Sequence, residues 1–151
     1  MRGTLLTTLH TLGKEWRVTL DFKPTGYLSG WTSSIHLTIE GNNRHYGYRT
    51  PYIHPKNPNT GKMRILSAVN GIYNYAQEFD QLPVDAWTTI TISQTLEGGK
   101  YMYRITIGGQ ELHAVENTQA VQFHNVKVYG SDPWYDAQPG SIRNLVIETR
   151  L

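Results

Sequence analysis

Pairs of acidic side chains are the first residues to weigh, because two carboxylates at the right separation can cleave a glycosidic bond. Retaining glycosidases hold the two groups about 5 Å apart, and inverting ones hold them about 6.5–9.5 Å apart. Here Glu15 and Asp21 alternate with apolar residues and should point away from a core, whereas Glu111 and Glu116 flank a short strand-like run. No two acids are predicted to face each other, so a glycoside hydrolase is the weakest of the functions considered.

Histidine is the second candidate for chemistry, as a general base or a metal ligand. The chain has six of them, which are His10, His36, His45, His54, His113 and His124. It contains neither the H-E-x-x-H spacing of a zinc site nor the G-x-S-x-G turn of a serine hydrolase. His36 and His113 are expected on the polar faces of strands. His45 and His54 share a polar loop, but two loop histidines make a weak metal site, so we predict no catalytic residue and no transition metal.

Two stretches combine aromatic rings with amides and a guanidinium, which is the mixture that a sugar-binding site needs. A sugar offers C–H patches to a flat ring and hydroxyls to polar partners. The predicted ligand-binding residues of these stretches are Asn43, His45, Tyr46, Tyr48 and Arg49 in the first, and Asn70, Tyr73 and Asn74 in the second. The alternative stays open that Tyr73 and Tyr75 lie on a sheet face and that the asparagines form turns.

The stretch Asp132-Pro133-Trp134-Tyr135 places two large aromatic residues in a turn. We favour a structural role for Trp134, in which it folds back over an open end of the molecule and stabilises it by about 1.5–3 kcal/mol if well buried. The alternative is that Trp134 and Tyr135 stack on a ligand. Tyr135 and Asp136 are expected to be the more exposed residues of this segment.

Alternation of apolar and polar residues runs through most of the chain and predicts strands with one face in a core. The runs that carry it are 16–22, 35–40, 88–94, 101–107, 123–129 and 141–149. Leu5, Leu9 and Leu12 are also assigned to a strand, because the threonines around them disfavour a short helix. The sum predicts an all-β sandwich or barrel.

Turn residues agree with this pattern. Gly98-Gly99 and Gly108-Gly109 each predict a hairpin. Ile142 is out of phase with its run, which predicts a bulge near Arg143. Residues 42–60 read as one long polar loop. Trp16 and Trp87 lie in strand-like runs and are expected in the core, while Trp31 is assigned to neither core nor surface.

Composition excludes several classes of protein. The 151 residues suit one domain, and 14 Lys and Arg against 12 Asp and Glu leave a net charge of +2, which is too balanced for a nucleic-acid surface. The absence of cysteine excludes disulfides and thiolate sites. No apolar run approaches the ~18 residues of a membrane span, and no signal peptide is recognisable at the start.

The order of three motifs, LPVDAWTTITISQ, GGKYMYRITIGGQEL and PGSIRNLVI, resembles the concanavalin A-like jelly roll of lectins, laminin G-like modules and pentraxin-like domains. The matching positions are Leu82, Trp87, Ile90, Tyr103, Ile105, Gly109, Leu112, Gly140, Ile142 and Leu145. From about Leu12 onward the chain looks most like repeat modules in extracellular proteins of cnidarians and other marine invertebrates. The resemblance implies recognition of glycans or proteins, often with calcium.

The resemblance also suggests where calcium would bind. In such modules a Gly- and Asn-rich loop supplies ligands, and here the corresponding stretch is EGNNRHYGYRTP, residues 40–51. Tyr48 stands where the pattern has an acid, and two arginines and a histidine weaken the site for a cation that prefers carboxylates. If calcium binds, Asp132 or Asp136 are the expected carboxylates. The acidic run typical of jelly-roll glucanases is missing from the sequence.

We therefore predict a single all-β domain over residues 1–151, a concanavalin A-like jelly-roll sandwich of two antiparallel sheets. Its predicted function is non-catalytic, lectin-like recognition of a glycan or glycoprotein by loops at one edge, in an extracellular setting. No cofactor is required, although calcium stays open, and neither nucleic acid nor membrane insertion is expected. The alternative is an adhesive or protein-interaction module without a sugar site, which could form homo-oligomers.

Overall fold

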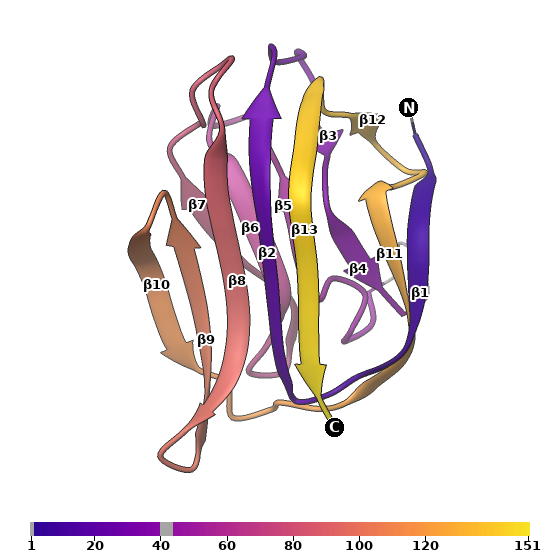
Figure 1. Cartoon of the computed structure of the whole chain (residues 1–151), viewed down its shortest axis with the longest axis vertical. Helices are drawn as coiled ribbons and strands as arrows, with labels where there is room; N and C mark the ends of the chain where they lie inside the picture. Colours follow the sequence, from indigo (N-terminus) through magenta and orange to yellow (C-terminus); the bar gives the residue numbers. More distant parts are fainter. Residues whose placement is uncertain (1, 40–43) are drawn as a thin grey trace.

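Two antiparallel β-sheets form the body of the molecule (Figure 1). The computed structural model describes residues 2–39 and 44–151, and all the regular elements of this part are strands. The six-stranded sheet has the order β1 (Thr4–Leu12), β11 (Phe123–Ser131), β4 (His36–Thr38), β5 (Tyr52–His54), β6 (Met63–Val69) and β7 (Ile72–Phe79). The five-stranded sheet has the order β10 (Gln110–Glu116), β9 (Lys100–Ile107), β8 (Thr88–Glu97), β2 (Glu15–Pro24) and β13 (Gly140–Arg150). A short parallel pair, β3 (Thr32–Ser33) and β12 (Asp136–Ala137), lies outside both sheets.

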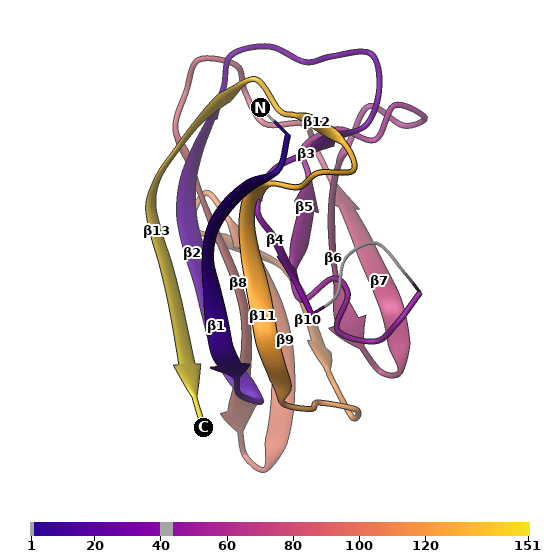
Figure 2. The same cartoon turned by 90° about the vertical axis from the view of Figure 1, so that its right-hand side faces the viewer.

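The core lies between the two sheets, which pack face to face (Figure 2). Strand β2 shows why, since every second residue from Trp16 to Phe22 is buried while its neighbours are more exposed. Ile90 and Ile105 face the same interior from β8 and β9, and Val126 and Val128 close it from β11. Burying each such side chain stabilises the fold by about 1.5–3 kcal/mol. The predicted all-β sandwich and these inward positions are confirmed.

Local features follow the predicted turns. Glu97 pairs with Lys100 across the Gly98-Gly99 hairpin, and both glycines have the positive φ that such a turn requires. The pairing of β13 with β2 shifts register between Arg143 and Val146, which confirms the bulge. Thr4–Leu12 is a strand, as expected. The described residues include no helix that is long and apolar enough to cross a membrane.

Three expectations are wrong. The predicted loop 42–60 is interrupted by strand β5, which is only three residues long and so carries too short a pattern to recognise. His36 is fully buried although its strand position is polar. Trp87 lies outside the core cluster and is half-exposed, because the alternation that turns Ile90 inward turns position 87 outward.

Candidate functional site

A cluster of rings covers the outer face of the six-stranded sheet. Leu37 and Ile53 face the core from β4 and β5, so their neighbours His36, Tyr52 and His54 point to the opposite face. These three side chains are nevertheless buried. We call them the buried floor. His36 stacks on Tyr52 with 3.7 Å between ring centroids and 6° between ring planes, and Tyr52 lies 4.2 Å from His54.

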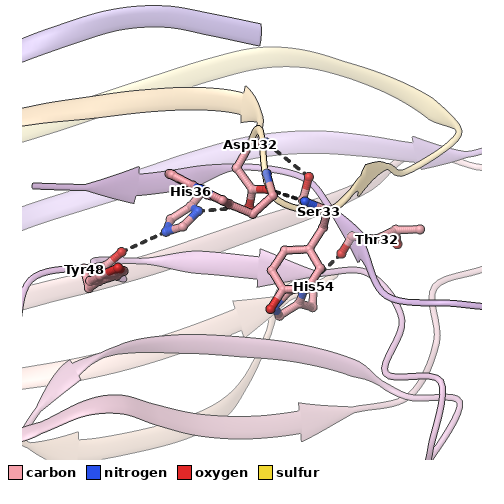
Figure 3. Close-up of polar contacts among 8 residues, drawn as sticks. Thr32, Ser33, His36, Tyr48, His54 and Asp132 are labelled. Atoms are coloured by element: carbon pink, nitrogen blue, oxygen red, sulfur yellow. Dashed lines mark hydrogen bonds and ion pairs between the residues drawn. The ribbon is translucent and has the colours of Figure 1, made fainter. Parts of the chain in front are cut away.

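His36 is held by acceptors on both ring nitrogens (Figure 3). Its Nδ1 lies 3.0 Å from Oδ2 of Asp132, and its Nε2 lies 2.8 Å from the carbonyl oxygen of Tyr48. A carbonyl can only accept, so Nε2 donates to it. Beside an ionised carboxylate Nδ1 donates as well, which makes the ring a cation in a neutral pair with Asp132. The pair is fully buried, with 0 % exposure of both side chains.

Asp132 also organises the turn that follows β11. Its Oδ1 accepts hydrogen bonds of 2.9 Å from the backbone N–H groups of Trp134 and Tyr135. Its own backbone N–H donates to Oγ of Ser33. Burial opposes ionisation of Asp132, but the hydrogen bond from His36 and the nearby positive charge outweigh it and hold the pKa of the carboxyl below its usual value. One carboxylate therefore joins the sheet and the aromatic loop.

His54 is a neutral member of the buried floor. Its Nδ1 donates to the carbonyl oxygen of Thr32 at 2.9 Å, which leaves Nε2 as the acceptor nitrogen. Burial is the main reason that the pKa of His54 is lowered to about 3. Trp31 lies 4.8 Å from the imidazole between centroids, and Tyr135 meets it edge-on at 4.9 Å. Two half-exposed rings thus rest on this histidine.

Trp134 folds back over the same face. It meets His36 edge-on at 5.8 Å and Tyr129 at 5.9 Å between centroids. This is the covering role that the sequence favoured, but the surface covered is the outer face of a sheet and not an open end of the sandwich. Tyr135 and Asp136 were both expected to be more exposed than Trp134. Trp134 and Tyr135 are both half-exposed, and only Asp136 is more exposed than Trp134.

Four half-exposed side chains surround the buried floor, and we call them the aromatic rim: Trp31, Tyr135, Arg49 and Arg64. The guanidinium carbon of Arg49 lies 5.6 Å from the ring centroid of Tyr52, and that of Arg64 lies 5.7 Å from Trp31. Cations at this distance from a ring are attracted by its electron-rich face. The rim therefore combines two flat rings with two cations, one over Trp31 and the other over Tyr52 of the buried floor.

The two rim arginines form no ion pair with any residue of 2–39 or 44–151. Arg64 lies opposite Glu78 in the strand register, yet that carboxylate accepts hydrogen bonds from Asn57 and Thr60 instead. The Nε of Arg49 is buried and has no hydrogen-bond partner among the described residues. The terminal nitrogens of both guanidinium groups also form no hydrogen bond with a described residue, and these nitrogens retain donors for an external partner.

The first predicted loop is only partly at this site. Asn43 lies outside the described residues. Tyr48 is fully buried, so its ring offers no surface to a ligand, and its carbonyl serves the buried floor. His45 is exposed, and Tyr46 is half-buried with its hydroxyl donating to the carbonyl oxygen of Gln119 at 2.9 Å.

The second predicted stretch lies at the β6–β7 hairpin. Asn70 is exposed, and its side-chain oxygen accepts from Thr118, while its backbone N–H donates to the side chain of Asn117. Tyr73 and Asn74 are half-buried on the edge strand β7. Residues 117–119 thus form hydrogen bonds with both Tyr46 and Asn70, so the two predicted stretches lie against the same segment. Arg49, Trp134 and Tyr135 belong to the other group, around the buried floor.

The sequence missed most of the buried floor and half of the rim. His36 was assigned to a polar face without a cover, and His54 to a loop. The available signal was that His36 precedes the apolar Leu37, because successive residues of a strand point to opposite faces. This signal placed His36 on the correct face of the sheet. Nothing local indicated that residues 132–135 return to cover that face.

The residues named for calcium are engaged with protein partners. Both oxygens of Asp132 accept hydrogen bonds, and Asp136 forms a 2.8 Å ion pair with Arg2. Among the described residues, no group of three or more His, Cys, Asp or Glu side chains is arranged to hold a metal ion. Calcium binding therefore stays a prediction, and these two carboxylates would have to exchange partners to take part in it.

Comparison with known proteins bears on the fold. No protein-family model matches this sequence, and no curated protein is similar to it. Among solved structures, domain 4 of AbnA, an extracellular GH43 arabinanase of Geobacillus stearothermophilus in complex with arabinotriose, is 18 % identical with a TM-score of 0.63. The match covers 95 % of this chain and 64 % of that one, so this chain spans less than two thirds of its length.

Two further structures share the arrangement. The heptameric SAP-like pentraxin of Limulus polyphemus is 12 % identical with a TM-score of 0.59, over 97 % of this chain and 72 % of that chain. The CBM40 of a Ruminococcus gnavus IT-sialidase, bound to α2,3 sialyllactose, is 11 % identical with a TM-score of 0.56, over 98 % of this chain and 89 % of that chain. At such low identities, structural similarity shows the fold alone. That fold is a concanavalin A-like jelly-roll sandwich of two antiparallel sheets.

Proposed function

We propose that this protein is a non-catalytic carbohydrate-recognition module that binds a glycan or glycoprotein at the aromatic rim. One observation carries the proposal, namely that half-exposed Trp31 and Tyr135 both contact the buried His54. Arg64 lies over Trp31 and Arg49 over Tyr52, and neither arginine forms an ion pair with a described residue. Rings of this kind accept the C–H face of a sugar, and guanidinium groups donate to its oxygens.

Rigidity of the buried floor supports this role. The ion pair of His36 with Asp132 and the turn that Asp132 caps hold Tyr135 in place before any ligand arrives. A site whose side chains are already ordered loses less conformational entropy on binding than a mobile one. The rim is thus suited to bind a ligand without rearranging.

The solved structures support the general class. The arabinanase domain was seen with arabinotriose and the CBM40 with sialyllactose, each on a fold like this one. Two observations favour an extracellular setting. The arabinanase is an extracellular enzyme, and the order of the motifs resembles repeat modules in extracellular proteins of marine invertebrates. Adhesion through protein contacts or homo-oligomers remains the second candidate, because β1 leaves Leu5 and Leu6 about half exposed at a sheet edge.

Absence of catalysis is part of the proposal. Asp132, which caps the turn that carries Tyr135, is fully buried in its pair with His36. Asp21 on the other sheet accepts hydrogen bonds from Thr89, Arg143 and Asn144. Because these contacts stabilise the ionised form, the pKa of Asp21 is lowered, which disfavours a role as a general acid.

A glycan array with the folded protein, with and without calcium, tests the proposal. Retention of a glycan should fall at least tenfold in Trp31→Ala and in Tyr135→Ala. Tyr101→Ala is the matched control, since Tyr101 is a half-exposed tyrosine on the five-stranded sheet. Circular dichroism establishes that each variant is folded. Retention that is unchanged in both rim variants would assign recognition to another surface, and concentration-dependent assembly without any glycan would favour the adhesive alternative.

A further inference from the structure

A hollow lies on the outer face of the five-stranded sheet, opposite to the face that carries the aromatic rim. Its volume is about 510 Å³, and it is lined by Trp87, Thr88, Thr89, Thr91, Thr106, Gly108 and Gly109. The lining comes from the start of β8, from β9 and from the β9–β10 turn, which are adjacent in the sheet (Figure 1). Small-molecule sites commonly have volumes of about 300–1,000 Å³. The hollow is therefore large enough for a small ligand and is separated from the aromatic rim by the thickness of the sandwich.

Trp87 is fixed at the side of this hollow. The guanidinium carbon of Arg143 lies 3.9 Å from the indole centroid, and Nζ of Lys23 lies 5.1 Å from it. Asp21 in turn accepts from Nε of Arg143 at 3.2 Å and from Asn144 at 2.9 Å. The guanidinium of Arg143, which lies at the β13 bulge, is thus held in place over the indole. A large ring that is held in this way, yet is half-exposed, is an anchor for a ligand.

Free hydroxyl groups line the same hollow as the indole. Thr91 of β8 and Thr106 of β9 are directly opposite each other in the strand register. Neither hydroxyl forms a hydrogen bond with a described residue, whereas that of Thr89 donates to Asp21 at 2.6 Å. Threonine is common on exposed sheet faces, so its presence alone indicates nothing. A facing pair of unengaged hydroxyls in the same hollow as a fixed tryptophan is a more specific arrangement.

None of the described residues that line the hollow is charged. The charged groups around it are engaged with one another or with the indole: Lys23 and Arg143 lie over Trp87, and Asp21 accepts from three donors. Glu111, which is opposite Thr106 in the strand register, is paired with Arg104 at 2.7 Å. The surroundings thus offer one apolar ring, hydroxyl donors and acceptors, and the backbone of two glycines. This combination favours a ligand that is uncharged, rich in hydroxyls and partly apolar on one face.

We propose that the Trp87 hollow is a second carbohydrate site, which binds a segment of a neutral oligosaccharide with one sugar ring against the indole and its hydroxyls on Thr91 and Thr106. The site does not depend on the aromatic rim, because no residue is shared between them. A chain with both sites would hold two glycan segments on opposite faces.

Titration followed by NMR tests this proposal, with arabinotriose, maltotriose, cellotriose and lactose as neutral probes. At least one probe should shift the indole N–H signal of Trp87 and the amides of Thr91 and Thr106. Binding at these signals should weaken at least tenfold in Trp87→Ala and in the double variant Thr91→Val/Thr106→Val, which removes hydroxyls at nearly constant volume. Thr8→Val is the control, since Thr8 is an exposed strand threonine of the other sheet.

The outcomes separate the two sites. Tyr135→Ala should leave the Trp87 signals and their titration unchanged, even where it abolishes retention on the array. If none of the four probes shifts the Trp87 signals, or if the double valine variant binds like the unmodified protein, the hollow is not a sugar site and the rim proposal is unaffected. Glycan retention that is unchanged in Trp31→Ala and Tyr135→Ala, together with shifts at Trp87, would overturn the rim proposal and leave the hollow as the glycan site.

Discussion

Asp132 and His36 are 96 residues apart in the chain, yet they meet as a fully buried pair with 3.0 Å between Oδ2 and Nδ1. Asp132 directly follows β11, and His36 begins β4, which is the neighbour of β11 in the six-stranded sheet. The same carboxylate caps the turn that carries Trp134 and Tyr135. One side chain therefore neutralises a buried imidazole and positions a ring of the proposed glycan site.

Replacing Asp132 with asparagine should destabilise the protein by about 3–5 kcal/mol, which is typical when one partner of a buried ion pair is removed. The variant leaves His36 without its counter-charge. Urea unfolding followed by tryptophan fluorescence measures the change. Asp136→Asn is the control, because its ion pair with Arg2 is exposed and should contribute no more than about 1 kcal/mol. Equal midpoints for the two variants would contradict a stabilising role of the buried pair.

Stability should decrease as the pH is lowered from about 6.5, because the folded chain keeps His54 neutral down to a pKa of about 3. Between these values the unfolded chain takes up a proton that the folded chain does not, so the unfolded state gains about 1.4 kcal/mol per pH unit. The contribution is fully favourable above pH 6.5. Burial also lowers the pKa of His113, which acts in the same direction.

The comparison of His54→Gln with the unmodified protein isolates this effect. Glutamine can still donate to the carbonyl oxygen of Thr32 but does not titrate. The free energy of unfolding of the variant, measured in urea between pH 4.5 and pH 8, should therefore vary less steeply with pH. Parallel curves for the two proteins would show that His54 is not kept neutral by the fold.

Gly13 should tolerate no side chain. A Cβ at this position would clash with the backbone carbonyl of Arg150, so alanine would push the end of β13 away from the segment that leads into β2. Overpacking of this kind costs about 1–3 kcal/mol or more. Gly26→Ala is the matched control, since no described atom lies within 4 Å of the methyl carbon that alanine would add there. Differential scanning calorimetry should give a lower Tm for Gly13→Ala alone, and a normal Tm would disprove the close approach.

Asn117 should prove essential for the loops that meet at one end of the sandwich. Its side chain is buried, donates to Gln94 and to the carbonyl of Ala68, and accepts from the backbone of Asn70. Asn117→Ala leaves these groups unsatisfied, at a cost of about 1–3 kcal/mol for each one that stays dry. Amide hydrogen exchange at Asn70 should accelerate in the variant. Protection as strong as in the unmodified protein would mean that the side chain is not what orders this hairpin.

Period-two alternation determined the architecture from the residues alone. Val18, Leu20, Ile90 and Ile105 lie in the core as predicted, because a strand with one apolar face must bury that face against another layer, which in this molecule is the second sheet. The glycine pairs predicted the positions of the hairpins. Ile142, which breaks the alternation of its run, predicted the bulge in β13. These features depend on a few neighbouring residues, so they are readable without knowledge of the rest of the chain.

The candidate site depended on tertiary structure. Alternation assigned His36 and Trp87 to outer faces, but it does not say what covers an outer face. The chain returns at Asp132 to bury His36, whereas Trp87 remains half-exposed beside an open hollow. Burial of a polar ring requires a partner for its charge and its hydrogen bonds, and here that partner is 96 residues away. The sequence by itself thus determined which residues face inward, and only the folded chain decided which outward residues are sealed and which are left to bind.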